Sequence, residues 1–289
     1  MNSYLLRYLA ALLILGSNGI VASLLSASST QIVLIRTFLG SLLLFLAFIV
    51  QRGRFSFYKN KHDCVFLILS GILQGLMWIF LHAAYNAAGV GVASLIYYSA
   101  PVLVLLLSPL LFHEKLTLPV IVGFFTVMLG VLLVNGLGST ALISRAGLVY
   151  AVLSALCFAF MVITQKLATG VVGLENSLMQ VFISFLTVAA VLLVRRELFF
   201  TLPRSELLPA FIIGAVNTAL ACYLYFSSIK GLKVQTVSLL GYLEPLSAVV
   251  FSALLLRERM SIPQIVGAAL ILCGAVATEL FMRRKAASV

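Results

Sequence analysis

Charge is scarce in this sequence: only 9% of its 289 residues are Asp, Glu, Lys or Arg, whereas 63% are hydrophobic. A soluble globular chain is typically about 25% charged and about 45–50% apolar. The composition therefore excludes a soluble fold. A membrane helix needs about 20 apolar residues to cross a hydrocarbon core of roughly 30 Å, so the chain has room for about ten spans.

Cysteine is also rare, and none of the four cysteines is paired in a CxxC motif. They lie singly inside apolar stretches, where a free cysteine behaves as a small hydrophobic residue. We therefore expect neither a disulfide framework nor a metal site, and no cofactor. The four positions are Cys64, Cys157, Cys222 and Cys273.

The sequence lacks the motifs of several membrane enzymes and pumps. It contains no HExxH, no GxSxG and no Walker loop, and its one aspartate, Asp63, lies outside the predicted spans. The first two absences argue against a catalytic function, and the third argues against an ATP-driven pump. A lipid-modifying enzyme and a passive channel remain alternatives to a transporter.

Basic residues outnumber acidic ones by 19 to 8, giving a formal net charge of +11. They are scattered over short loops and chain ends rather than gathered in one patch, so we expect no nucleic-acid partner. Anionic lipids and the positive-inside rule account for them. About twice as many fall on one side of the predicted topology, which places both termini in the cytoplasm and the protein in a bacterial inner membrane.

Apolar runs separated by short polar or Gly-rich breaks predict an all-α membrane protein with ten transmembrane helices. The first run is expected to be a retained span rather than a cleaved signal peptide. The predicted spans are 4–25, 31–51, 64–85, 92–112, 116–135, 146–167, 175–194, 207–228, 235–256 and 261–282.

The chain contains an internal repeat. Residues 92–131 and 236–275 share about a third of their residues at an offset of 144, including the pairs Pro101 with Pro245 and Glu114 with Glu258. The repeat predicts two five-helix units, residues 1–140 and 141–289. Because five is odd, the units must enter the membrane in opposite orientations, and secondary transporters are often built this way.

These residues resemble the drug/metabolite transporter superfamily, specifically its ten-helix EamA type. The resemblance rests on Pro101 before His113-Glu114-Lys115, on Glu244-Pro245 before Arg257-Glu258-Arg259, and on Arg36 in the second helix. It covers essentially the whole chain. It implies a permease for amino acids, amines or other metabolites, often directed outward, with a cavity lined by helices 1, 3, 4, 6, 8 and 9.

Glu244 is the strongest candidate for a functional residue, because a carboxylate near the membrane centre costs at least about 2.5–3.5 kcal/mol on insertion scales. Its repeat counterpart is Ala100, so the helix motif itself does not require an acid there. We interpret Glu244 as a proton or ion-coupling site, or as a counter-charge for a cationic or zwitterionic solute. A carboxylate that fixes helix packing is the alternative.

Gln74, Trp78 and His82 recur every four residues and therefore lie on one face of the third predicted helix. Such a polar and aromatic stripe suits a water-filled cavity, and His82 could also carry a proton. Packing and lipid contact are the alternatives for these side chains.

We expect the side chain of Arg36, in the second predicted helix, to reach the membrane interface by snorkelling. The other predicted substrate-binding residues are Asn18, Tyr97, Tyr98, Asn217, Tyr223 and Tyr242.

Taken together, the sequence predicts a secondary transporter that moves small metabolites by alternating access, with export as the expected direction and protons as the expected coupling ion. The expected partners are a small-molecule substrate and the lipid bilayer. Two complete repeats make a monomer sufficient, and a dimer is left open.

Overall fold

The protein is a bundle of membrane-length helices. The computed structural model describes residues 3–135, 144–198, 201–255 and 261–287, with residues 135 and 283–287 described by backbone alone, and no strand occurs in these ranges. The bounds of the α-helices are α1 Ser3–Gly16, α2 Asn18–Ala22, α3 Ser29–Val50, α4 Lys61–Ala88, α5 Val90–Tyr97, α6 Ala100–Phe112, α7 Leu118–Asn135, α8 Arg145–Leu167, α9 Gly173–Val194, α10 Leu207–Gly214, α11 Ala221–Ile229, α12 Val234–Leu240, α13 Leu243–Leu255 and α14 Ile262–Ala287.

Nine helical stretches in the described part of the chain are long and apolar enough to cross a membrane, and Leu118–Val134 is a shorter apolar helix. They coincide with the ten predicted spans to within a few residues. Helices suit this environment because each satisfies its own backbone hydrogen bonds, which lipid cannot do. The prediction of an all-α membrane protein is confirmed.

Two of these stretches are interrupted near their middle. The first break separates α5 from α6 and has Pro101 in the first turn of α6, and the second separates α12 from α13 and has Pro245 in the first turn of α13. Proline cannot donate a backbone hydrogen bond, so a helix readily restarts at it. The breaks place helix ends inside the bundle.

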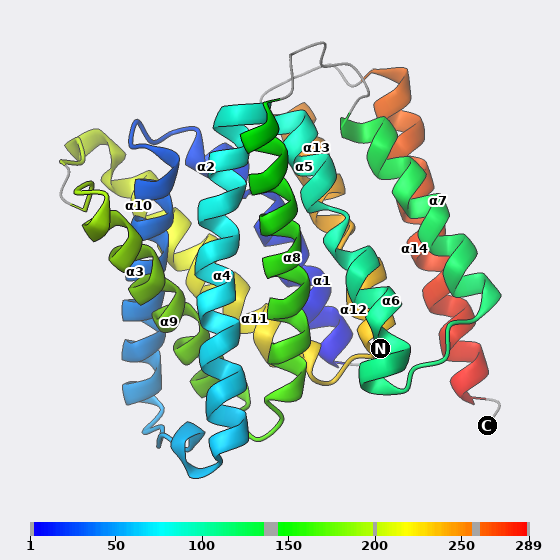
Figure 1. Ribbon diagram of the computed structural model, residues 1–289, viewed down its shortest axis with the longest axis horizontal. Coiled ribbons are helices and arrows are strands. Elements are labelled where there is room, and N and C mark those ends of the chain that lie inside the picture. The colour runs from blue at the N-terminus through cyan, green and yellow to red at the C-terminus, as the bar shows by residue number, and fades with distance from the viewer. Residues whose placement is uncertain (1–2, 136–143, 199–200, 256–260, 288–289) are drawn as a thin grey trace.

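The packing centres on α4, which lies between α8 and α9, and on α1, which packs against α11 and α13 (Figure 1). Helices α3 and α9 pack together at one edge, and α7 and α14 form a pair at the opposite edge. Both termini lie at the same end of the bundle (Figure 1).

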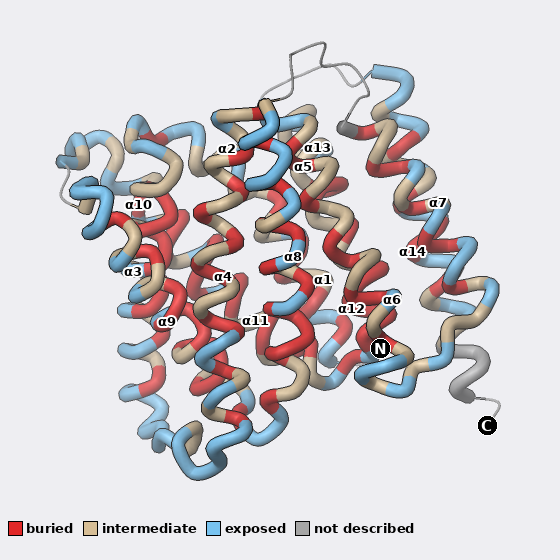
Figure 2. Tube along the Cα trace, in the orientation of Figure 1, coloured by how far each residue is buried: buried red, intermediate tan, exposed pale blue. Residues whose placement is uncertain are grey.

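Buried residues run through the inner helices, while exposed residues cover the outward faces of α3, α7 and α14 (Figure 2). Many of these exposed residues are large and apolar, among them Phe45, Phe125 and Leu272. Apolar surface on this scale is costly in water but not against hydrocarbon. The burial pattern is therefore that of a protein surrounded by lipid.

The α7 and α14 pair depends on glycine at its closest approach. A β-carbon on Gly130 would lie 2.6 Å from the backbone oxygen of Gly267, and a β-carbon on Gly267 would lie 2.6 Å from the oxygen of Gly130. Because the obstacle is backbone, no side-chain rotation relieves it. Small residues allow such close packing of membrane helices.

We therefore expect Gly130→Ala to destabilise the protein by about 1–3 kcal/mol, as overpacking typically does. Gly19→Ala is the matched control, because a β-carbon at Gly19 of α2 meets no atom within 4 Å. That control should be neutral or slightly stabilising, since alanine is favoured over glycine in a helix. Thermal unfolding of both variants in detergent measures the difference, and equal midpoints would contradict the packing argument.

Candidate functional site

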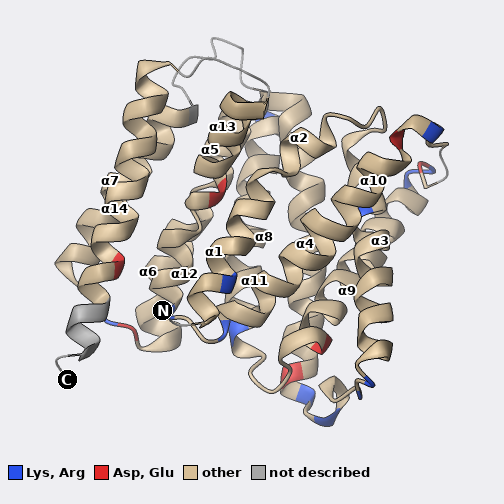
Figure 3. Ribbon diagram, turned by 180° about the vertical axis from the view of Figure 1, so that it is seen from behind, with Lys and Arg blue, Asp and Glu red and all other residues tan. Residues whose placement is uncertain are grey.

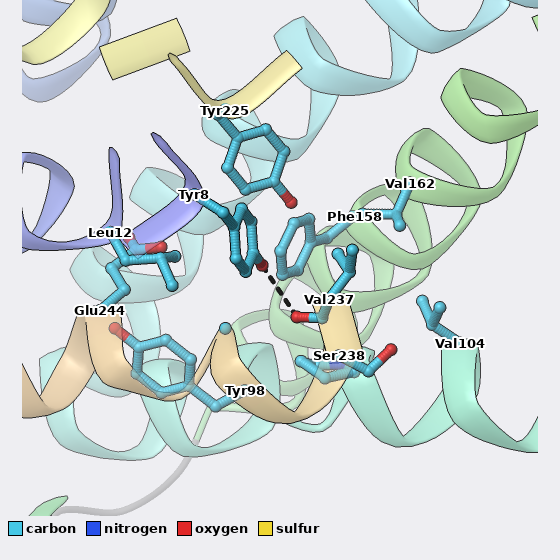
Figure 4. Close-up of a pocket in the computed structure, with 12 residues that line it drawn as sticks. Tyr8, Leu12, Tyr98, Val104, Phe158, Val162, Tyr225, Val237, Ser238 and Glu244 are labelled. Carbon is cyan, nitrogen blue, oxygen red and sulfur yellow. Dashed lines mark hydrogen bonds between the residues drawn. The ribbon is translucent and has the colours of Figure 1, made fainter. Parts of the chain in front are cut away.

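A buried cavity of about 70 Å³ lies between the inner helices and is large enough for a few water molecules. A smaller cavity of about 20 Å³ shares Phe158, Tyr225 and Glu244 with it. Figure 4 shows the rings of Tyr8, Phe158 and Tyr225 grouped around this smaller cavity. The larger one is lined by Leu15, Asn18, Arg36, Gln74, Met77, Trp78, Tyr97, Phe158, Met161, Cys222, Tyr225, Phe226 and Glu244.

Glu244 reaches both cavities from the break between α12 and α13. It lies in the first turn of α13, where the positive end of the helix dipole stabilises a carboxylate. No described residue donates a hydrogen bond to its side-chain oxygens, and only its backbone oxygen accepts one, from Ser247 at 2.8 Å. The carboxylate is thus held in place by the helix end and remains able to bind a solute or a proton.

Arg36 lies inside the bundle with only 3% of its surface exposed, so the expectation that it snorkels to the interface is wrong. Its Nε donates to Thr218 Oγ1 at 3.0 Å and its Nη2 donates to the backbone oxygen of Asn217 at 3.1 Å. The guanidinium group also lies 4.6 Å from the centroid of the Trp78 ring, a cation–π contact. These contacts hold the guanidinium group of Arg36 at the cavity wall.

A π-helical turn, Ala215–Leu220, creates the acceptors that hold Arg36. In this turn Thr218 donates to the backbone oxygen of Ile213, five residues earlier, at 2.8 Å. The Asn217 side chain donates to Ile14 O at 2.8 Å and Ser17 Oγ at 2.9 Å, which ties the turn to α1. Such turns occur frequently at functional sites, because they redirect backbone groups away from the regular hydrogen-bond pattern of an α-helix.

Arg36 and Glu244 line the same cavity without forming an ion pair. Among the described residues, the one contact within 4.0 Å between a basic and an acidic side chain joins His62 Nδ1 and Asp63 Oδ1, at 3.9 Å, near the start of α4. Separating two buried charges in a membrane is costly unless something else binds to them. The arrangement can therefore accept a solute that brings one charge of each sign.

Polar and aromatic groups complete the lining of the larger cavity. Gln74 accepts a hydrogen bond from Ser184 Oγ at 3.0 Å, and Asn18 Oδ1 is buried without a hydrogen-bond partner among the described residues. Tyr97 stacks on Phe158 with ring centroids 5.2 Å apart. These groups offer a solute both hydrogen bonds and an apolar wall, as small-molecule sites usually do.

The structure brings together five of the predicted site residues, and places the others around them. Asn18, Gln74, Trp78, Tyr97 and Glu244 line the larger cavity, and Tyr98 lines the smaller one. The remaining four, His82, Asn217, Tyr223 and Tyr242, line neither of these two cavities.

Three of those four have evident structural contacts, and those of Asn217 with Ile14 and Ser17 are given above. The Tyr242 hydroxyl donates to the backbone oxygen of Tyr98 at 2.8 Å, which links the two helix breaks. His82 Nδ1 lies 2.7 Å from the backbone oxygen of Trp78, one turn earlier in α4.

Sequence reasoning missed Arg36 and its partner Thr218 as parts of the site. The signal for Arg36 was present, because an arginine inside a 22-residue apolar helix is expensive and usually functional. No comparable signal marked Thr218, since a threonine in an apolar helix is ordinary. The role of Thr218 depends on the π-helical turn, which the sequence does not predict.

One end of the bundle is closed by polar contacts between the two halves of the chain, and this is the end where both termini lie. The Glu114 carboxylate accepts hydrogen bonds from the backbone nitrogens of Val234 and Gln235, at 2.8 and 3.0 Å, and so caps α12. Glu114 thus caps a helix rather than forming an ion pair with the neighbouring Lys115, and its repeat counterpart Glu258 lies outside the described residues.

Two lysines join segments of the second half at the same end of the bundle. Lys166 Nζ donates to the backbone oxygen of Leu232, and Lys230 Nζ donates to the backbone oxygens of Ala168 and Val171. Burial lowers the pKa of Lys230 to about 8, although the charge of Asp63 opposes the shift. Figure 3 shows these basic and acidic residues concentrated near the bundle ends and sparse between them.

The described residues contain no group of three or more His, Cys, Asp or Glu that could hold a metal ion. The larger cavity is lined by polar, aromatic and apolar side chains.

Comparison with known proteins finds relatives that are named as transporters. The chain is 24% identical to the uncharacterized transporter YxxF of Bacillus subtilis (strain 168), over 99% of this chain and 92% of that protein. It is 24% identical to the uncharacterized inner membrane transporter YicL of Salmonella typhimurium, over 98% and 97% of the two chains. It is also 28% identical to protein PecM of Dickeya dadantii, over 75% of each.

The fold is shared with a solved crystal structure that superposes with a TM-score of 0.85, covering 97% of this chain and 99% of that one at 18% identity. The EamA-like transporter family matches residues 2–136 and 145–279, which together are most of the sequence. The chain is therefore a multi-pass membrane protein that belongs to the EamA-like transporter family, and a transporter rather than an enzyme.

Proposed function

We propose that this protein is a secondary transporter of small zwitterionic metabolites, amino acids in particular, and that it works by alternating access. The observation that carries the proposal is that Arg36 and Glu244 line one cavity and are too far apart to form a salt bridge. A carboxylate of the solute would bind Arg36 and an ammonium group would bind Glu244. Trp78 and Tyr97 would contact its apolar part.

Alternating access is supported by the closed end of the bundle, where Glu114 joins the two halves of the chain, while Lys166 and Lys230 join segments within the second half. The cavity lies beyond this closure, so opening toward that side requires the contacts of Glu114 to break. Transport would then alternate between this conformation and one in which the same contacts are absent.

The helix contacts support a pair of inverted repeats. The third helix of the first unit, α4, packs on α8, the first helix of the second. The equivalent contact, between the third helix of the second unit, α11, and the first helix of the first unit, α1, is also present. A pseudo-two-fold axis in the membrane plane would relate the two pairs and put the site near the midplane.

We further propose proton coupling through Glu244, export as the direction, and both termini on the cytoplasmic side of a bacterial inner membrane. The support for orientation is the excess of basic residues at the end that carries the termini. The support for coupling is a carboxylate at the cavity that accepts no hydrogen bond from a described residue.

Flux in liposomes tests the proposal with three related solutes: an apolar amino acid, the amine that lacks its carboxylate, and the acid that lacks its amino group. We expect saturable flux that is at least about tenfold faster for the amino acid, because each charged hydrogen bond contributes about 1.5–3 kcal/mol. Reversing an imposed proton gradient should change the rate. Flux without saturation would indicate a channel, and equal flux of all three solutes would contradict zwitterion recognition.

A further inference from the structure

A third cavity, a groove of about 330 Å³, lies on the outer surface of the bundle between α3 and α9, away from the two inner cavities. Five of its nine lining residues are phenylalanines. Its one hydroxyl group, on Ser41, donates to the backbone oxygen of Phe38 in the same helix at 2.9 Å and offers no free donor. The lining residues of this groove are Phe38, Ser41, Leu42, Phe45, Phe55, Leu178, Met179, Phe182 and Phe185.

The groove covers a large part of one lipid leaflet. Its α3 lining runs from Phe38 to Phe45 and its α9 lining from Leu178 to Phe185, in each case about 10 Å of helix. Half of a hydrocarbon core is roughly 15 Å. The groove can therefore hold about two thirds of the length of an acyl chain.

The segment after α3 folds back over the mouth of the groove. Gly53 N donates to the backbone oxygen of Phe48 at 2.9 Å, and the rings of Phe48 and Phe55 lie 4.6 Å apart. This turn places Phe55 in the groove and leaves Arg52 and Arg54, which shortly precede Phe55 in sequence, exposed at the mouth of the groove. Basic residues are visible at this end of α3 and α9 in Figure 3.

These two arginines have no acidic partner among the described residues. The nearby carboxylate of Glu175 is already engaged, because it accepts hydrogen bonds from Ser56 N, Ser56 Oγ and Phe57 N at 2.5–2.7 Å. Two uncompensated guanidinium groups at the membrane interface attract an anionic headgroup, and arginine binds phosphate with bidentate geometry.

We propose that this groove is a binding site for an anionic phospholipid such as phosphatidylglycerol, with one acyl chain between α3 and α9 and its phosphate at Arg52 and Arg54. The groove supplies affinity for the chain through buried apolar surface. The arginines supply selectivity for the charge. The site is separate from the solute cavity, because the groove and the cavity share no lining residue.

Native mass spectrometry of the full chain in detergent tests the proposal with phosphatidylglycerol and phosphatidylcholine that carry identical acyl chains. We expect tighter binding of phosphatidylglycerol. The double variant Arg52→Gln/Arg54→Gln should lose about thirtyfold of that affinity, since each basic residue at the surface contributes about 1 kcal/mol. It should bind phosphatidylcholine as the wild type does.

The matched control is Arg195→Gln/Arg196→Gln, which removes the same charge from the opposite end of α9, where both residues are exposed. A loss in this control as large as in the first double variant would overturn the proposal, as would equal binding of the two lipids by the wild type. Neither double variant alters a buried residue, so both are expected to fold.

A second pair of variants tests the acyl-chain part of the site. Leu42→Trp fills the groove, whereas Leu193→Trp adds the same bulk to an exposed position of α9 outside it. We expect Leu42→Trp to weaken binding of both phospholipids at least about tenfold and Leu193→Trp to leave it unchanged. Equal effects of the two substitutions would show that no chain binds in the groove.

Discussion

Replacing Glu244 with glutamine is expected to reduce the transport of solutes that carry an ammonium group by about 10- to 100-fold, while the protein still folds. The magnitude follows from the loss of one charged hydrogen bond, about 1.5–3 kcal/mol. Glutamine keeps the size and shape of the side chain, and no described residue donates a hydrogen bond to the carboxylate. Solute flux in liposomes measures the change.

The same variant separates proton coupling from charge recognition. If Glu244 carries the coupled proton, the remaining flux of the Glu244→Gln variant should no longer respond to an imposed proton gradient. Glu197→Gln is the matched control, because Glu197 is exposed beyond the end of α9. A Glu244→Gln protein that transports and couples as the wild type does would reduce Glu244 to a packing residue and remove the basis of the proposed function.

Replacing Arg36 with glutamine is expected to have a second large effect, of similar size, on solutes that carry a carboxylate. Arg36 presents five N–H donors, of which Nε and Nη2 bind Thr218 and Asn217. The donors that remain are available to a carboxylate in the cavity. Flux of the amino acid should fall by about 10- to 100-fold, whereas flux of the amine that lacks a carboxylate should be retained.

Arg36→Lys distinguishes charge from geometry. Lysine keeps the charge but cannot hold both Thr218 and Asn217 while it binds a planar carboxylate, so we expect only partial recovery of amino acid flux. Arg145→Gln, at an exposed position, is the control for loss of a charge. If Arg36→Gln and Glu244→Gln lowered the fluxes of the amine and the amino acid equally, the two residues would not recognise opposite ends of the solute.

The two proposals fail independently. Zwitterion recognition depends on Arg36 and Glu244 inside the bundle, and lipid binding depends on Arg52, Arg54 and an outer groove. Lipid binding is measured on purified protein without any transport, so a negative flux experiment leaves it intact. Conversely, a groove that binds no anionic lipid says nothing about the solute cavity.

The sequence by itself determined the helices and the class of protein. Spans are readable because lipid enforces a strong local rule, about 20 apolar residues with few charges, which needs no knowledge of the neighbouring helices. Pro101 and Pro245 lie next to the two helix breaks for a local reason too, since proline acts on its own backbone. Glu244 was identifiable for a similar reason, because a carboxylate inside an apolar span is costly wherever its neighbours lie.

Only the tertiary structure decided which polar groups share a cavity. Arg36 could have reached the interface or faced inward, and the choice depended on Thr218 and Asn217, about 180 residues away in the chain. The π-helical turn that presents these acceptors is set by packing between α1, α3 and α10, not by local propensity. The position of each helix follows from its own residues, whereas the chemistry of the site follows from contacts between helices that are distant in sequence.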